Sequence, residues 1–460
     1  MSLEIKHYPQ DYRTVYNPIE LVMLESDATT RGYTGFAYLI DVYVDAISSS
    51  NLIGRLKVPP TTNGFGRFDL SGIMESYLSS SLGELNGTNL GPQPAAIGNY
   101  RDFKLKYGWI HYNTGTATID MNQTVTLPDS STDTNTSLIT LNGSLPNYRR
   151  DVVNFYDWQT NNYYNKYMPT TSSFALNTKK FLTNSPNYLG TYDLNFKPTS
   201  FSDKNQKVRL TDEGYIYFLV NTDIKKINYI IKDGSSIINK SFGVNFNPAT
   251  TTRVVKIPSA PATINAINPA DLTSGTQPII TSTVTDYSIY LSETSVNDTM
   301  IEYFSFKLDT DCRYETRRLE FLNSLGGFDY YNFTKVSRHR EDIERKFLKA
   351  NPSDLTSTGA IEYSISNREK IQYYTKSSSK MKLNSDWVDA ETFNWLLELI
   401  ESPEVYLLDD YTTPSGTTEV RRIPIKNIEG NWEEKISSTD NIFNLSIDLE
   451  FSMDNYRQRF

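Results

Sequence analysis

The stretch that decides the fold is residues 317–333, which read RRLEFLNSLGGFDYYNF. Leu319 and Phe321 alternate with charged neighbours, as in a strand with one buried face. The Gly326–Gly327 pair supplies a turn at low steric cost, and the aromatic run after it is typical of a second strand. The pattern favours a β-hairpin, with a helix over residues 314–325 as the alternative.

The same alternation of apolar and polar residues recurs outward from this hairpin in both directions. Residues 36–44 and 103–111 show it most clearly, and Asp233–Gly234 is a typical two-residue hairpin turn. Strands are predicted over residues 15–23, 36–44, 52–58, 66–70, 103–111, 117–127, 214–220, 227–232, 252–257, 287–291, 301–308, 405–408, 421–425 and 443–451.

Three segments favour helix. A short helix is predicted near 71–82, with Ser71 as its N-cap, and a longer one over 389–401, started by Asp389 and ended before Pro403. The longer helix places Phe393, Leu396, Leu397 and Ile400 on its apolar face and Glu398 on the other. Residues 337–350 carry opposite charges four apart, which favours an exposed helix, with a strand as the alternative.

The chain has 460 residues, more than one ordinary core holds, so several domains are expected. We predict a mainly β fold of tandem antiparallel β-sandwich-like domains, the C-terminal one α+β with a single packed helix. The expected domains are 1–147, 148–300 with long polar arms, and 301–460. A linker is expected near 258–276, and residues 148–167 fit no element clearly.

Composition excludes some classes of function. Lys and Arg number 45 against 54 Asp and Glu, and the net charge of −9 argues against general nucleic-acid binding. Cys312 is the single cysteine, so no intrachain disulfide forms. Residues 1–7 lack the apolar run of a secretion signal, and no window approaches about 18 apolar residues, so no membrane insertion is expected.

Chemistry-bearing residues are scattered. His7, His111 and His339 lie in unrelated contexts, whereas catalysis needs a histidine beside a positioned nucleophile. Cys312 has no nearby histidine and is interpreted as a small buried side chain. We therefore predict no catalytic residue and no enzyme, although two converging carboxylates of a glycosidase remain possible in a chain with many acids.

Metal and nucleotide motifs are incomplete. Asp309 and Asp311 begin like a calcium loop, but the glycine and the distal glutamate are missing. The Asp409–Asp410 pair is interpreted as a solvated loop at a strand end. Gly64–Gly66 lacks the later glycine of a phosphate loop and is interpreted as a turn between strands. No metal and no cofactor is predicted.

Tyrosines cluster in two places among the 32 of the chain. Tyr163, Tyr164 and Tyr167 form one cluster, and the Tyr330–Tyr331 pair forms the other. Such rings stack on sugars, but tyrosine is also enriched in cores and subunit interfaces. Core or interface is the favoured interpretation for both clusters.

Three blocks of sequence together resemble virion structural proteins of tailed bacteriophages that infect Bacteroidota, including the crAss-like phages. The first block is Asn17–Glu20 with 36–44 and 68–73, the second is 321–329, and the third is 383–387 with 402–406. The resemblance implies a non-enzymatic part of the phage virion that forms a homo-oligomeric ring in the tail or neck, as a collar, connector or tail-tube-like ring around the DNA channel.

The same resemblance implies other tail, neck and portal proteins as partners, with assembly in the host bacterial cytoplasm. DNA would pass through the channel without sequence-specific binding. Two other classes stay open. One is a baseplate or tail-tip adhesion module that binds host surface glycans or a receptor. The other is an enzyme that degrades that surface.

Overall fold

A computed structural model gives the fold. Strands make up 54% of it and helices 10%, which confirms the mainly β prediction. The structure describes residues 3–8, 12–80, 82–86, 93–94, 97–113, 115–127, 131–134, 136–145, 182–186, 188–193, 206–219, 226–243, 254–274, 277–292, 300–311, 313–351, 353–429 and 442–456. Cys312, residues 148–167 and therefore the cluster of Tyr163, Tyr164 and Tyr167 lie outside this range.

The chain divides into two compact units. Unit 1 comprises Met1–Thr310 and Leu322–Asp329, and unit 2 comprises Asp311–Phe321 and Tyr330–Phe460. The turn of the 317–333 hairpin therefore belongs to unit 1. The three expected domain ranges stay predictions.

Two sheets form the N-terminal part of unit 1. One orders β11 (Thr132–Asp133), β10 (Val125–Thr126), β1 (Leu3–His7), β3 (Glu20–Glu25) and β6 (Phe65–Asp69). The other orders β2 (Tyr12–Thr14), β12 (Thr136–Leu141), β8 (Tyr100–Asn113), β4 (Ala37–Val44) and β5 (Leu52–Val58), with β9 (Thr116–Asp120) paired to β8. The short helices are α1 (Ala28–Arg31), α2 (Ser71–Met74), η1 (Glu75–Tyr77) and η2 (Ile97–Asn99).

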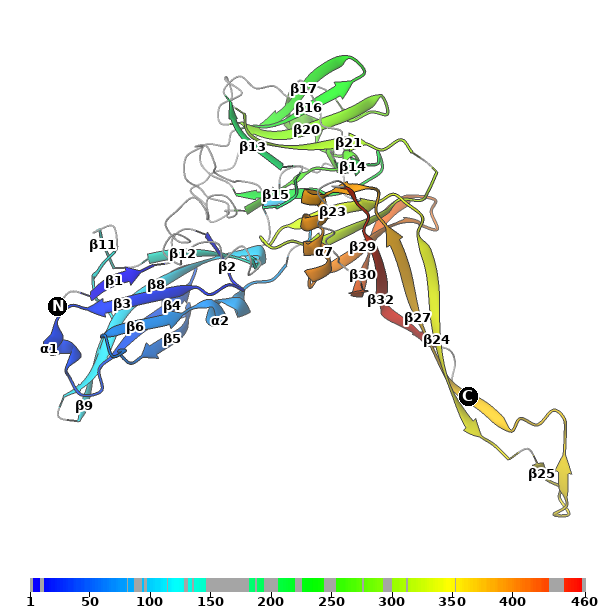
Figure 1. The fold of residues 1–460 in the computed structure, drawn as a ribbon, viewed down its shortest axis with the longest axis horizontal. Helices are drawn as coiled ribbons and strands as arrows, with labels where there is room; N and C mark the ends of the chain where they lie inside the picture. The colour runs from blue at the N-terminus through cyan, green and yellow to red at the C-terminus, as the bar shows by residue number, and fades with distance from the viewer. Residues whose placement is uncertain are drawn as a thin grey trace. The chain divides into compact units, whose positions relative to one another are not determined.

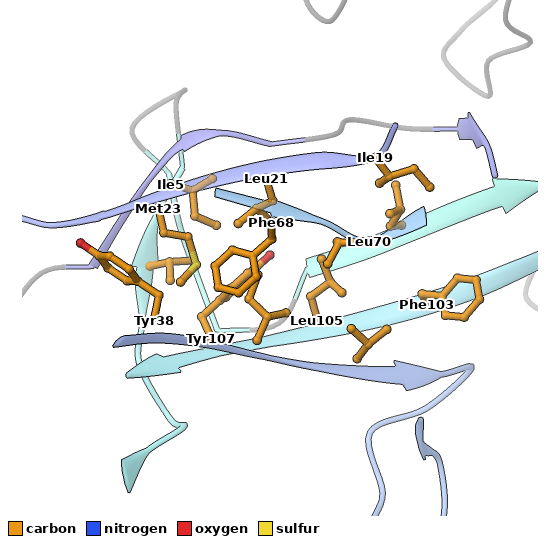
Figure 2. Packing of buried hydrophobic residues seen from close by; sticks show 14 of the residues in the cluster. Ile5, Ile19, Leu21, Met23, Tyr38, Phe68, Leu70, Phe103, Leu105 and Tyr107 are labelled. Atoms are coloured by element: carbon orange, nitrogen blue, oxygen red, sulfur yellow. The ribbon is translucent and has the colours of Figure 1, made fainter. Parts of the chain in front are cut away.

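The core of this part lies between strands of the two sheets (Figure 2). Strand β4 is buried along nearly its whole length because both of its faces are covered. Tyr38, Ile40 and Val42 enter the main core, while Ala37 and Leu39 pack in a smaller cluster. The alternation predicted for 36–44 therefore separates two apolar environments.

The second part of unit 1 is built on a seven-stranded sheet and a three-stranded sheet. The first orders β13 (Tyr188–Asp193), β21 (Met300–Leu308), β20 (Val284–Ser292), β16 (Lys226–Asp233), β17 (Ser236–Gly243) and β19 (Leu272–Ser274), with β14 (Gln206–Val208) on β21. The second orders β15 (Tyr215–Leu219), β18 (Val254–Pro258) and β7 (Gln93–Pro94). Buried Tyr229 and Tyr287 donate their hydroxyls to the backbone oxygens of Pro258 and Ser259 at 3.0 and 2.8 Å.

Two features of unit 1 differ from expectation. The prediction of a linker near 258–276 is wrong, because α5 (Pro261–Asn265), η4 (Pro269–Asp271) and β19 lie there. Ile264 and Ile267 of this segment are buried in the core. The α2 segment starts after Leu70 without a side-chain cap, so Ser71 is not its N-cap. Instead the Asp69 carboxylate accepts the backbone N–H of Ser71.

Strand pairing in the described part of the chain is mostly antiparallel, but three of the described pairs are parallel. They are β1 with β10, β2 with β12, and β14 with β21. Each pair joins segments roughly a hundred or more residues apart in the sequence, and parallel strands need such long connections. The predicted all-antiparallel sheets are therefore too simple.

Unit 2 is built on one seven-stranded sheet. Its order is β23 (Phe328–Phe333), β22 (Arg317–Leu322), β29 (Val405–Thr412), β30 (Thr418–Glu429), β32 (Ser446–Tyr456), β27 (Lys370–Asn384) and β24 (Arg338–Lys349). Strands β25 (Ser353–Leu355) and β26 (Ile361–Tyr363) form one small hairpin, and β28 (Val388–Asp389) pairs with β31 (Ile442–Phe443). The predicted hairpin of 317–333 is confirmed as β22 and β23.

The predicted helix over 389–401 is confirmed as α6 (Ala390–Trp395) followed directly by α7 (Leu397–Glu401). The Asp389 side chain caps it by accepting the backbone N–H of Thr392 at 2.9 Å. Its buried face agrees with the predicted one at Phe393 and Leu396, whereas Leu397 and Ile400 are only half-buried. The helical segment is interrupted at Leu396, so Trp395, Leu399 and even Glu398 turn inward.

The helix favoured for 337–350 is wrong, because this segment is strand β24, paired with β27 over its whole length. The opposite charges four apart do not meet. Instead neighbours two apart on one strand face pair, as Arg340 does with Asp342 at 2.7 Å. Asp342 also pairs across the strands with Lys380 at 3.2 Å.

The turn between β22 and β23 is held inside unit 1. The Asn323 side chain accepts the N–H groups of Leu325 and Gly327, each at 3.0 Å, and donates to the Leu182 oxygen at 2.8 Å. The Asn99 amide donates to the Gly326 oxygen at 3.1 Å. A Cβ on Gly326, where φ is +83°, would meet the Asn142 oxygen at 2.7 Å.

This close approach predicts an effect for Gly326→Ala that backbone strain alone does not explain. Gly115 has the same φ of +83° and open space around its Cβ position, so Gly115→Ala is the matched control. We expect the control to lose about 1–2 kcal/mol, the cost of a left-handed residue, and Gly326→Ala to lose clearly more. Urea unfolding of both variants measures this, and equal losses would contradict the packing of the turn.

Candidate interaction surface

The three histidines lie on three separate strands, β1, β8 and β24. His111 is buried and stacks on Trp109 with ring centroids 4.9 Å apart, so it is a packed residue of β8. His339 is exposed beside Glu341. Burial lowers the pKa of His7 to about 4, with further lowering from the charges of Arg13 and Arg67.

Two of the four acids singled out in the sequence, Asp311 and Asp409, pair with arginines. Asp311 pairs with Arg313 at 2.7 Å, and hydrogen bonds from that side chain and backbone lower the pKa of Asp311 to about 2. Asp409 lies in strand β29 and pairs with Arg421 at 2.8 Å, so the solvated-loop interpretation is wrong. No three His, Cys, Asp or Glu side chains gather around a possible metal position in the described residues.

Gly64 has a φ of +84° and lies in the turn between β5 and β6, as predicted. Tyr330 and Tyr331 are buried in strand β23, so they cannot serve as an exposed sugar platform. Tyr331 packs edge-on against Phe333 and Trp395 in the core of unit 2. The core interpretation of this pair is confirmed.

Glu320 is the most deeply buried carboxylate of unit 2, with a side chain 0% exposed. Arg422 donates to both of its oxygens, through Nε to Oε2 and through Nη2 to Oε1 at 3.0 Å. The Tyr330 hydroxyl donates to Oε1 at 2.6 Å. With both oxygens engaged, this carboxylate holds strands β22, β23 and β30 together and is not free for acid–base chemistry.

Unit 2 also contains a long hairpin that extends outside its core. It comprises residues 338–384, and we call it the arm. Strands β24 and β27 run out beyond the rest of the sheet, and β25 and β26 lie at the far end (Figure 1). Strand β32 accompanies β27 from Asn384 to Lys376. Beyond that point the arm is a ribbon of two strands.

The arm carries large apolar side chains that are exposed to solvent. Their exposure ranges from 46% for Tyr373 to complete exposure for Ile365. The set comprises Ile343, Phe347, Leu348, Leu355, Ile361, Tyr363, Ile365 and Tyr373. Scattered apolar residues are normal on surfaces, but such a group on one projecting element makes it a candidate interaction site.

These side chains lie on both faces of the ribbon. Phe347 is opposite Gln372 and Leu348 opposite Ile371, and successive residues of a strand point to opposite faces. A two-stranded ribbon has no second layer against which either face could be buried, and isolated hairpins are marginal in water. The charge pattern predicts a helix only for residues 337–350 and gives no sign of this surface, although Ile361, Tyr363 and Ile365 alternate as in a strand.

Comparisons with known proteins do not assign the chain to a family. No family model matches the chain, and no curated protein matches it either. Within the described part of the chain, none of the helices has the length and apolar character needed to span a bilayer.

The buried pair of Glu320 and Arg422 predicts an asymmetric response to mutation. Glu320→Ala leaves a largely buried guanidinium without its partner and should cost about 3–5 kcal/mol. The double variant Glu320→Leu/Arg422→Met removes both charges and should cost less. Unfolding followed by tryptophan fluorescence measures both.

Asp311→Ala serves as the control, because this carboxylate also pairs with an arginine but lies at the surface. It should leave the unfolding midpoint unchanged. If Glu320→Ala behaved like this control, the buried pair would have no structural role.

Proposed function

We propose that this chain is a non-enzymatic structural subunit of a tailed-phage virion, which forms a homo-oligomeric ring in the tail or neck around the DNA channel. The resemblance of three sequence blocks to virion proteins of phages that infect Bacteroidota supports the class. The observation that carries the ring is the arm, because its exposed apolar side chains need a partner and a ring supplies one at every subunit.

The architecture is consistent with this proposal. In this proposal the two sheets around the N-terminal core form a sandwich-like domain, and the core within residues 208–308 belongs to a second β domain. The C-terminal domain is α+β, with one helical segment packed on its sheet. The link from these β domains and the extended arm to tail and neck rings is an analogy at the level of protein class.

The charge and the partners fit the same role. A net charge of −9 gives no general attraction for DNA, so DNA would pass the ring without being held. Partners would be further copies of the chain and adjoining tail, neck and portal proteins. Assembly would take place in the host bacterial cytoplasm, and the subunit would end in the virion.

A second candidate is a tail-tip or baseplate module that binds host glycans. One observation favours it: the Trp387 side chain is 68% exposed, next to β28. An exposed indole offers a flat apolar face of the kind on which a sugar ring stacks. The buried Tyr330 and Tyr331 offer no such face.

The ring predicts a defined mass for the purified full-length chain. Light scattering should give a multiple of 52.5 kDa, and negative-stain images should show closed rings with a central opening. Gold-labelled antibodies against the chain should mark the neck or tail of phage particles. A 52.5 kDa monomer at every concentration would contradict the ring.

The same preparation separates the two candidates. For the adhesion module, the chain binds a panel of host surface glycans, and Trp387→Ala abolishes that binding without changing the mass. For the ring, Trp387→Ala changes neither property, and glycan binding is absent.

A further inference from the structure

The arm continues past the edge of the sheet. Strand β24 runs on for five residues, Arg345–Lys349, beyond the last pair of β27 with β32, and these extend about 17 Å at strand rise. The far end of the arm, residues 350–369, which we call the tip, therefore extends well beyond the body of the sheet from which it starts (Figure 1).

The tip concentrates the apolar residues. Leu355, Ile361, Tyr363 and Ile365 are each exposed by 63% or more. The tip hairpin pairs over three residues a strand, Ser353–Leu355 against Ile361–Tyr363. So short a hairpin gains little from its own hydrogen bonds, and burial of these side chains against a partner would supply the missing stabilisation.

The charge of the arm indicates the chemistry of that partner. Residues 338–384 contain ten Lys and Arg against six Asp and Glu, a net +4. The whole chain carries −9, so the remainder carries −13. The arm is thus the basic segment of an acidic protein, and another copy of the same chain presents a surface of complementary sign.

Local pairing shows the same excess of positive charge. Lys349 lies directly opposite Lys370, and like charges in opposite positions of two strands repel. Among the described residues, no acid forms an ion pair with Lys349, Lys370 or Arg345. An acidic surface against this part of the ribbon would relieve that repulsion.

We infer that the arm docks on a second copy of this chain, with its apolar tip buried there and the Lys349–Lys370 pair of its ribbon against an acidic surface of that neighbour. The positive charge lies in the ribbon, where residues 345–349 and 370–375 hold four Lys and Arg and no acid, whereas tip residues 350–369 hold one Arg against three acids. The inference rests on the proposed ring and names the contact that closes it. The arm differs in sign from the rest of the chain, so the contact joins two different surfaces. Such head-to-tail contacts generate rings when the rotation closes.

The test uses the full-length chain and changes the tip alone. In Leu355→Ser/Ile361→Ser/Ile365→Ser, three apolar contacts are lost, and the dissociation constant of the oligomer should rise at least about tenfold. In Lys349→Glu/Lys370→Glu, the charge is reversed and association should weaken as well. Sedimentation velocity over a range of concentrations measures both.

Two further variants separate the effect of the tip from the effects of misfolding and of general surface hydrophobicity. In the first, residues 350–369 are replaced by Asn-Gly, which joins the opposed Lys349 and Lys370 by a two-residue turn and removes the tip without cutting the ribbon. It should associate as weakly as the triple variant. The second, Ile119→Ser/Met453→Ser, removes exposed apolar side chains outside the arm and should assemble as the unchanged chain does.

A cross-link identifies the partner directly. Ile365→Cys in a Cys312→Ser background carries a benzophenone maleimide, and irradiation should give a product of twice the chain mass with attachment in an acidic segment. Attachment within the same chain would overturn the inference. If the unchanged chain assembles and the tip variants assemble equally well, the inference fails and the ring stands. If the unchanged chain never assembles, the proposed ring fails as well.

Discussion

A ribbon of two β-strands cannot bury both of its faces, and this constraint governs what we conclude about the molecule. Strand β4, for example, has apolar clusters on both sides. Among the described residues no such layer covers the outer arm, yet it carries Phe347 and Leu348 on opposite faces. Exposure of such side chains to water is unfavourable, which is the reason we propose a partner for the arm.

Buried polar contacts hold the described cores together. Asn323 fixes the turn between β22 and β23 with three side-chain hydrogen bonds, and the ion pair of Glu320 with Arg422 joins β22 to β30. These groups are buried and fully engaged, so they stabilise without offering a reactive centre. The proposed function therefore rests on the surface of the arm, where charge and apolar area would decide what binds.

Much of the fold could be predicted from local pattern. The 317–333 hairpin and strands β4 and β8 follow from alternation, and the helix near the C-terminus follows from Asp389 and Pro403 at its ends. Other features depend on contacts remote in sequence. The parallel pairs join distant segments, and the chain around α5 is ordered because Ile264 and Ile267 pack into a core that the Pro- and Ala-containing sequence around them does not indicate. In β24 the opposite charges four residues apart favour a helix, but pairing with β27 makes this segment a strand. For that reason the sequence pattern does not predict the arm.

Hydrogen exchange of the tip amides tests the central claim most directly. Backbone N–H groups of residues 350–369 should exchange slowly in concentrated, assembled protein and quickly after dilution below the assembly threshold, while the amides of β4 stay protected in both. Equal and rapid exchange of the tip at all concentrations, in a protein that is assembled, would show that the arm has no partner and would contradict the account.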